Sequence, residues 1–196
     1  MALIKSALEL ALERTKDIAG DKQSLKAKQL KEEGMRLFTS IMEKPDFDAR
    51  KQLETFPKDD QPILREGLFT VLMNRIQLPS SELALGDLEA VERGLTALMP
   101  KEKHLKELRA QLEEFYSQYL ADREQLYDAI VQQYAPVLRQ KEQQLAAKTG
   151  QRVTLTPDQD PEFQNFAKKN IDRLDSQYNE SINQLKEQLS QFFHKK

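Results

Sequence analysis

Residues 100–150 read PKEKHLKELRAQLEEFYSQYLADREQLYDAIVQQYAPVLRQKEQQLAAKTG, and this stretch decides the fold of the chain. Its apolar residues recur mostly at steps of three and four, so they form one stripe along a single helix. The stripe consists of Leu105, Leu108, Leu112, Phe115, Tyr119, Leu126, Ile130, Tyr134, Leu138 and Leu145. Pro100 suits the first turn of a helix, and Gly150 suits the position that follows its last turn. A helix of this length spans about 75 Å, so we expect part of it to project and to need a partner for its stripe.

The partner is the stretch from Pro161 to Phe193, which carries a second apolar stripe. Its residues also follow steps of three and four, as in the seam of a coiled coil. They are Phe163, Ala167, Ile171, Leu174, Tyr178, Ile182, Leu185, Leu189 and Phe192. The two stretches therefore predict a long antiparallel, coiled-coil-like helical hairpin with its tip near residues 150–160. Pro136 lies inside the first helix, where we expect a kink rather than a break because the stripe stays in phase across it.

A compact tip would also fix the register of the hairpin. Both helices rise equally per residue, so opposed residues should have numbers that add up to about 309. This register returns Phe192 to the level of Phe115–Ser117. The expected pairs are Leu145 with Phe163, Leu138 with Ile171, Tyr134 with Leu174, Ile130 with Tyr178 and Leu126 with Ile182. A domain-swapped dimer would keep the same contacts between two chains.

The first hundred residues carry shorter amphipathic segments separated by turn signals. The expected helices span residues 3–18, 21–42, 45–56, 61–77 and 83–99, with a restart of the last one at Gly86-Asp87. Gly20 should close the first helix, and Gly34 inside the second predicts close contact between helices. The core should centre on fully buried Leu68, Val71 and Leu72. We therefore predict an all-α chain with a small N-terminal bundle at 1–100 and the projecting hairpin at 101–196.

The N-terminal stretch resembles a known family. Ile4–Asp21 reads IKSALELALERTKDIAGD, and Lys31–Gly34 reads KEEG. These residues resemble the opening of an uncharacterised all-helical bacterial family. The resemblance implies a helical fold and brings no activity with it.

Composition narrows the class of protein further. The net charge is −2 with 32% charged residues, which gives no support for non-specific binding to nucleic acid. There is no cysteine, which excludes disulfides and thiolate zinc sites and fits a reducing compartment. Lys5, Glu9 and Glu13 interrupt the apolar N-terminus, so we expect neither a signal peptide nor a transmembrane segment. We therefore expect the protein to be cytoplasmic.

Two groups of residues are candidate metal ligands. His104 and His194 belong to no metal motif, so we expect both to be solvent-exposed. Asp158, Asp160 and Glu162 form an acidic cluster whose oxygens suit a hard cation. Their spacing fits the start of a helix better, with Asp160 as the N-cap and Glu162 near the positive end of the dipole.

Other chemical motifs are weaker still. Lys22, Lys26, Lys28 and Lys31 could contact phosphates, but Glu32 and Glu33 follow at once, as on a solvated helix face. The sequence contains no glycine-rich phosphate loop, nucleophile elbow or paired metal-binding histidines. We therefore expect no catalytic, cofactor-binding or metal-binding residue, and no cofactor.

This elimination and the expected shape point to a non-catalytic protein–protein interaction or assembly module rather than an enzyme. One alternative is a nucleic-acid or ribosome-associated helical factor that uses the basic stretch and Arg152. The other is a helical enzyme with a carboxylate metal site. The expected partner is another protein or a second copy of the chain.

The candidate partner-binding residues fall into two sets. The first set lies at the tip and the second lies off the main seam, where apolar side chains mark contact sites. They are Arg152, Val153 and Leu155, and Leu120, Val131 and Phe166. The helix around Leu3–Leu12 is a further candidate for docking a partner or a second copy.

Overall fold

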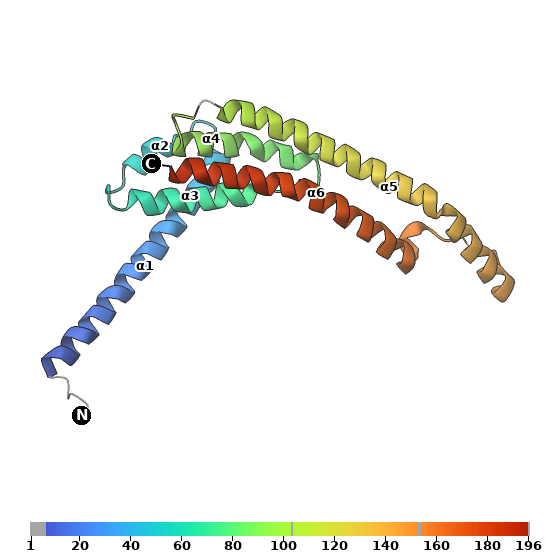
Figure 1. Cartoon of the computed structure of the whole chain (residues 1–196), viewed down its shortest axis with the longest axis horizontal. Coiled ribbons are helices and arrows are strands. Elements are labelled where there is room, and N and C mark those ends of the chain that lie inside the picture. Colours follow the sequence, from blue (N-terminus) through green and yellow to red (C-terminus); the bar gives the residue numbers. More distant parts are fainter. Residues whose placement is uncertain (1–6, 103, 153, 196) are drawn as a thin grey trace. The chain divides into compact units, whose positions relative to one another are not determined.

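The computed structural model describes residues 7–102, 104–152 and 154–195, and this part of the chain is built from helices (Figure 1). The helices are α1 (Ala7–Glu43), α2 (Ala49–Glu54), α3 (Gln61–Arg75), the 3₁₀ helix η1 (Glu82–Asp87), α4 (Leu88–Leu98), α5 (Leu105–Thr149), the 3₁₀ helix η2 (Pro157–Gln159) and α6 (Pro161–His194). None of the described residues is in a strand, so the all-α prediction is confirmed. No helix among them combines the length and the apolar character that crossing a bilayer requires.

The backbone contacts divide the chain into two compact units. The first unit comprises Met1–Arg75 and Glu89–Leu105, and the second comprises Ile76–Leu88 and Lys106–Lys196. The first unit holds α1 to α4 without η1, and the second holds η1 and the pair α5 and α6. The boundary expected at residues 100 and 101 stays a prediction, and each unit is described by itself below.

The first helix is longer than the sequence predicts. We expected two helices that meet at Gly20 and Asp21, but α1 runs without interruption from Ala7 to Glu43. A glycine ends a helix when it adopts a positive φ, and among the described glycines only Gly150 does so. Inside a helix a glycine costs only about 1 kcal/mol relative to alanine. The good helix formers on both sides outweigh that cost.

Two glycines bring α1 and α3 into direct backbone contact. A Cβ atom added to Gly34 would lie 2.0 Å from the carbonyl oxygen of Leu64, and one added to Gly67 would lie 2.2 Å from that of Lys31. Neither distance is compatible with any side chain larger than hydrogen. The close helix–helix contact that the sequence predicts at Gly34 is therefore confirmed.

The core of the first unit lies on one face of α3. Leu64, Leu68 and Leu72 have no exposed surface, and Phe69 is also buried. The prediction of a fully buried Val71 is wrong, because this side chain is only half-buried. Successive residues in a helix are rotated by about 100°, which places Val71 at the flank of the face that the three leucines share.

Leu72→Ala tests this core. The substitution removes most of a fully buried side chain, so we expect it to lower the free energy of unfolding by about 2–5 kcal/mol. Chemical denaturation followed by circular dichroism measures the loss. Val71→Ala is the control on the same helix, and a similar loss for both variants would contradict the assignment of the core face.

Two arginines in the first unit satisfy carbonyl groups at helix ends. Arg93, in α4, donates hydrogen bonds to the carbonyl oxygens of Ile41 and of Pro45, the latter at 2.6 Å, where α1 ends. Arg65, in α3, donates to the carbonyl oxygen of Leu98 at 2.5 Å. The last carbonyl groups of a helix lack donors within that helix. The two guanidinium groups therefore connect α4 to α1 and α3.

Only one of the two predicted ends of α5 is confirmed. The helix begins at Leu105 and not at Pro100. Proline has no N–H for a hydrogen bond to the preceding turn and is common just after a helix, and Pro100 terminates α4 in this way. At the other end, Gly150 has a φ of +71° and its N–H donates to the carbonyl oxygen of Ala146 at 2.9 Å. The predicted glycine stop is therefore confirmed, and α5 is continuous through Pro136.

Helices α5 and α6 form an antiparallel hairpin, as predicted, but in a different register. Phe163 packs against the ring of Tyr134 with 5.3 Å between centroids, about three helical turns before its expected partner Leu145. Tyr178 was expected to oppose Ile130. Instead, the centroid of its ring lies 5.1 Å from the ring centroids of Phe115 and Tyr119. The register with numbers adding up to 309 is therefore wrong.

The connection between the two helices explains the shift. The described residues between α5 and α6 (150–152 and 154–160), which we call the return segment, do not form a compact turn. They run back along α5, and the backbone N–H of Leu155 donates to Glu142 Oε1 at 2.8 Å. In consequence α6 begins beside the middle of α5, and Figure 1 shows the last turns of α5 extending past the first residues of α6.

Candidate partner-binding site

Tyrosine–aspartate hydrogen bonds join the two helices of the hairpin. Tyr119 of α5 donates to Asp175 of α6 at 2.8 Å, and Tyr178 of α6 donates to Asp122 of α5 at 2.5 Å. Burial, followed by the hydrogen bond to the carboxylate, raises the pKa of both tyrosines to about 12. Each hydroxyl therefore stays protonated and keeps donating at neutral pH. Two further pairs nearer the tip are Tyr127 with Asp158 at 3.4 Å and Tyr134 with Asp160 at 3.3 Å.

An apolar cluster fixes the start of α6 against α5. Its buried members are Ile130, Phe163 and Ala167. The rings of Tyr127 and Tyr134 meet Phe163 edge-on, at 6.1 and 5.3 Å between centroids. Aromatic pairs in this geometry add to the stabilisation from burial alone. This cluster sets the register at the tip end of the hairpin.

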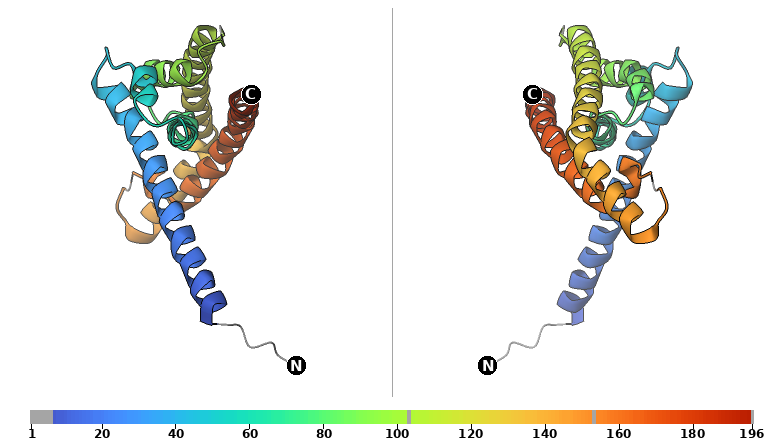
Figure 2. Two further views of the ribbon diagram at one scale, coloured as in Figure 1. Left: turned by 90° about the vertical axis from the view of Figure 1, so that its left-hand side faces the viewer. Right: turned by 90° about the vertical axis from the view of Figure 1, so that its right-hand side faces the viewer.

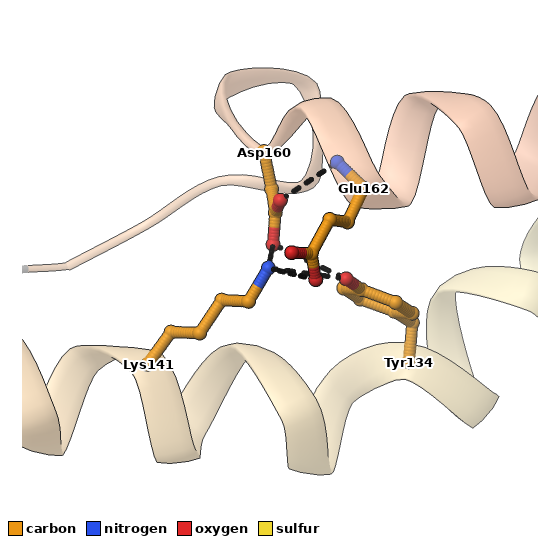
Figure 3. A network of polar contacts seen from close by, with 4 residues as sticks. All are labelled: Tyr134, Lys141, Asp160 and Glu162. Atoms are coloured by element: carbon orange, nitrogen blue, oxygen red, sulfur yellow. Dashed lines mark hydrogen bonds and ion pairs between the residues drawn. The ribbon is translucent and has the colours of Figure 1, made fainter.

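Lys141 holds the first turn of α6 through an ionic network (Figure 3). Its Nζ lies 2.6 Å from Asp160 Oδ2, 2.7 Å from Glu162 Oε2 and 3.3 Å from Tyr134 Oη. The bond to Asp160, followed by that to Glu162, raises the pKa of Lys141, and the Lys141 ammonium lowers the pKa of Asp160. The lysine and the buried aspartate therefore both carry charge at neutral pH.

The acidic cluster at 158–162 acts as a helix start. The side chain of Asp160 is the N-cap of α6 and accepts from the N–H of Glu162 at 3.0 Å, and Pro161 is the first helical residue. The interpretation of Asp160 as the N-cap, with Pro161 as the first helical residue and Glu162 in the first turn, is therefore confirmed. Among the residues that the structure describes, no group of three or more His, Asp or Glu side chains is placed to hold a metal ion.

The return segment is fixed along most of its described length. Glu142 accepts from the N–H of Leu155, and Thr156 and Gln159 form a reciprocal capping box around η2. Gln164 donates to the carbonyl oxygen of Asp158 at 2.6 Å. Figure 2 shows this segment leaving the end of α5 and looping back towards α6. It forms one wall of a defined surface.

That surface is a groove of about 300 Å³, which we call the tip groove. It lies between the last turns of α5 and the return segment. Its described lining residues are Lys141, Gln144, Leu145, Lys148, Leu155, Gln159, Asp160 and Pro161. The α5 residues among them lie after the point where α6 begins. The tip groove is therefore the part of the α5 seam that α6 leaves uncovered.

The structure separates the candidate residues into different places. Leu155 is half-buried in the wall of the tip groove, and Arg152 is exposed on the same return segment. Val131 and Phe166 each pack against the cluster around Ile130, and Phe166 is stacked on Tyr134 with 6.1 Å between ring centroids. Leu120 is half-buried elsewhere on α5.

The remaining candidates lie partly outside the described residues. Val153 is one of these, and so are Leu3 to Ser6 of the N-terminal candidate helix. His104 and His194 are exposed, as expected. In the basic stretch, Lys22 and Lys28 are exposed, and Lys26 forms an ion pair with Asp60 at 2.8 Å.

Sequence reasoning missed Lys141, the residue on which the site depends. It follows Tyr134 by seven residues and stands between Leu138 and Leu145 at seam spacing. The position of a lysine within an apolar stripe could have revealed it, because a buried or half-buried cation needs carboxylate partners. Asp160 and Glu162 supply them.

Asp160 predicts a specific dependence of stability on pH. Because its pKa is lowered on folding, its contribution is complete above the ordinary value of 3.8 and is lost as the pH falls through the lower folded value. We expect Asp160→Asn to lower the Tm above pH 3.8, and the difference from the wild type to shrink below it. Thermal unfolding at several pH values measures this, with exposed Asp59→Asn as control. A difference that stays constant down to the acid transition would contradict the role of Lys141.

Comparisons with known proteins identify a family. A family model described as a family of unknown function (DUF6657) matches residues 50–191, and the chain belongs to this family. The resemblance to an uncharacterised family is confirmed in this sense, although the match lies outside Ile4–Gly34, where the resemblance was seen. No curated protein and no solved structure matches the chain.

Proposed function

We propose that this member of the family is a non-catalytic interaction module that binds a partner protein at the tip groove of its α5–α6 hairpin. The observation that carries the proposal is the uncovered seam of α5. The face of α5 that packs on α6 ends at Lys141, and Leu145 and Lys148 continue this face towards the end of α5. Helix α6 does not cover these two residues, because it begins beside an earlier part of α5. A seam with an apolar centre and polar rim is the usual form of a contact surface.

The rigidity of the groove walls supports the same proposal. Binding orders side chains and loops at an interface, and walls that are already ordered reduce this cost. Here the ionic network of Lys141 and the Glu142–Leu155 hydrogen bond hold both walls before any partner arrives. The hairpin thus presents a preformed surface rather than one that folds on contact.

Site-directed photo-cross-linking tests the proposal in the cells from which the protein comes. A benzophenone amino acid replaces Gln144 or Lys148 in the full chain, and the matched controls replace Lys169 or Gln177, which are exposed on α6. We expect a discrete cross-linked product from the groove positions and none from the controls. Mass spectrometry then shows whether the product contains another protein or a second copy of this chain.

The same experiment gives clear contrary outcomes. Absence of a cross-linked protein from both groove positions would contradict partner binding at the tip groove. Equal cross-linking from groove and control positions would indicate non-specific contact and would contradict it as well.

A further inference from the structure

We infer that α6 also binds α5 in a second register, a minor state in which it lies one heptad nearer the tip of the hairpin. This inference goes beyond the proposed function, because it concerns a movement within the hairpin that needs no partner. It is carried by a seven-residue repeat in α5, by the exposure of the repeated residues and by the polar contacts that each register makes.

The residues of α5 that hold the start of α6 recur seven positions later. Ile130 and Val131 pack in the apolar cluster around Phe163, and Lys141 forms the ion pair with Asp160. A step of seven residues covers about 10 Å and returns to nearly the same face of a helix. A slide of that length therefore replaces each contact by a similar one. The repeated pairs are Tyr127 with Tyr134, Ile130 with Val137, Val131 with Leu138 and Lys141 with Lys148.

The slide also keeps a partner for Asp160. This carboxylate is buried, so the loss of its cation would oppose any movement of α6. Tyr134, which donates to it at 3.3 Å, has Lys141 as its counterpart seven residues later. Lys141 in turn has Lys148 as its counterpart. In the second register the aspartate lies between two lysines, and its charge remains paired.

The repeated residues are exposed in the observed register. Val137 is 38% exposed at an apolar position of the seam, and Leu145 is only half-buried. Lys148 is exposed and takes part in no ion pair with another described residue. The slide covers Val137 and brings the carboxylates of Asp160 and Glu162 to Lys148. It also fills part of the tip groove, so a partner bound there would hold α6 in the observed register.

The return segment is long enough for the slide. In the observed register it runs back along α5 to reach the start of α6 (Figure 1). Movement of α6 towards the tip shortens the distance that this segment must span. The hydrogen bond from Leu155 to Glu142 is lost, whereas the one from Tyr127 to Asp158 is remade by Tyr134.

Two tyrosine–aspartate bonds make the observed register the major one. Tyr119 donates to Asp175, and Tyr178 donates to Asp122. Seven residues after the two α5 members of these pairs, the helix carries apolar side chains that cannot replace them. They are Leu126 and Ala129. The slide therefore loses both bonds.

Disulfide trapping on the full chain tests the inference, since the sequence has no cysteine. Ala167 lies in one buried cluster with Ile130, so Ala167→Cys with Val137→Cys reports the slide towards the tip. The matched control is Ala167→Cys with Arg123→Cys, which lies seven residues before Ile130 and reports an equal slide in the other direction. Lys148→Cys with Glu162→Cys is a second reporter that leaves the core unchanged. Circular dichroism checks the helical content and Tm of each variant.

We expect oxidation to trap the Val137 pair within one chain and to leave the Arg123 pair reduced. Tyr119→Phe with Tyr178→Phe removes bonds that exist only in the observed register, so it should raise the rate of trapping about tenfold. Lys148→Gln should lower that rate about threefold without changing the Tm, because this lysine is unpaired until α6 has moved. Lys169→Gln, at an exposed position of α6, should change neither.

Three outcomes would overturn the inference. They are no disulfide within one chain from either reporter, equal trapping of the Val137 and Arg123 pairs, and a rate that Lys148→Gln leaves unchanged. Photo-cross-linking at the tip groove does not depend on the slide, so failure of this inference is distinguishable from failure of the proposed function.

Discussion

Gly34→Ala is expected to destabilise the first unit by about 3 kcal/mol or more. The new methyl group would lie 2.0 Å from the carbonyl oxygen of Leu64 and 2.9 Å from its Cα. These are backbone atoms, so the clash cannot be relieved by rotating a side chain, and α1 and α3 must move apart. Separation would expose Leu64 and Leu68, which are fully buried in the native structure. Urea denaturation followed by circular dichroism measures the loss.

Gly86→Ala is the matched control for this substitution. A Cβ atom at Gly86 meets no other atom within 4 Å, so we expect a change within about 0.5 kcal/mol. Gly94→Ala provides an intermediate case, since its Cβ would meet Leu72 Cδ2 at 2.6 Å, and this buried side chain can adjust its rotamer more readily than a helix backbone can move. Equal stability of the Gly34 and Gly86 variants would contradict the close crossing of α1 and α3.

Phe163→Ala is expected to cost about 3–5 kcal/mol in the second unit. Its ring is only 2% exposed and forms the centre of the cluster with Ile130 and Ala167. Truncation leaves a cavity there and also removes the aromatic contacts with Tyr127 and Tyr134. Because this cluster fixes the start of α6, hydrogen exchange should become faster in the first turns of α6 as well.

Phe192→Ala is the control on the same helix. That side chain is 48% exposed, so its removal should change stability far less than removal of Phe163. Similar losses from both variants, or unchanged exchange at the start of α6, would show that Phe163 does not anchor the hairpin.

The hairpin itself could be predicted from sequence because two long stripes leave few other ways to bury apolar surface. The helical state of both segments and the end of α5 at Gly150 follow from local properties of the chain. The same periodicity predicts the buried leucines of α3. It fails at Val71, which it predicts to be fully buried and which is only half-buried. Periodicity identifies a face, but the flanks of that face depend on how the neighbouring helix sits.

The register could not be predicted from the stripes alone. A seam with steps of three and four resembles itself after a shift of a few turns, so apolar residues oppose apolar residues in several registers. Polar pairs decide between them. Lys141 meets its carboxylates, and Tyr119 meets Asp175, only when α6 begins beside the middle of α5. The shifted register also creates the tip groove, which sequence reasoning therefore could not locate.

The helix ends were predicted less well where one residue has two uses. Pro100 suits both the first turn of a helix and the position just after one, and the structure uses it in the second way. Gly20 suits a helix stop, but it stops a helix only if its φ becomes positive. Both decisions depend on the packing of the neighbouring segments rather than on the residue itself.

The return segment has a consequence for how this protein can change during evolution. The position of α6 is set by Phe163 and by the Lys141 network, and not by the length of the chain that connects it to α5. Substitutions or insertions near Gln151, Arg152 and Thr154 should therefore leave the two helices in place, since each doubling of loop length adds only about 0.6 kcal/mol to the cost of closure. Under the proposed function, a lineage can thus alter which partner it prefers through a few exposed residues while inheriting the same scaffold.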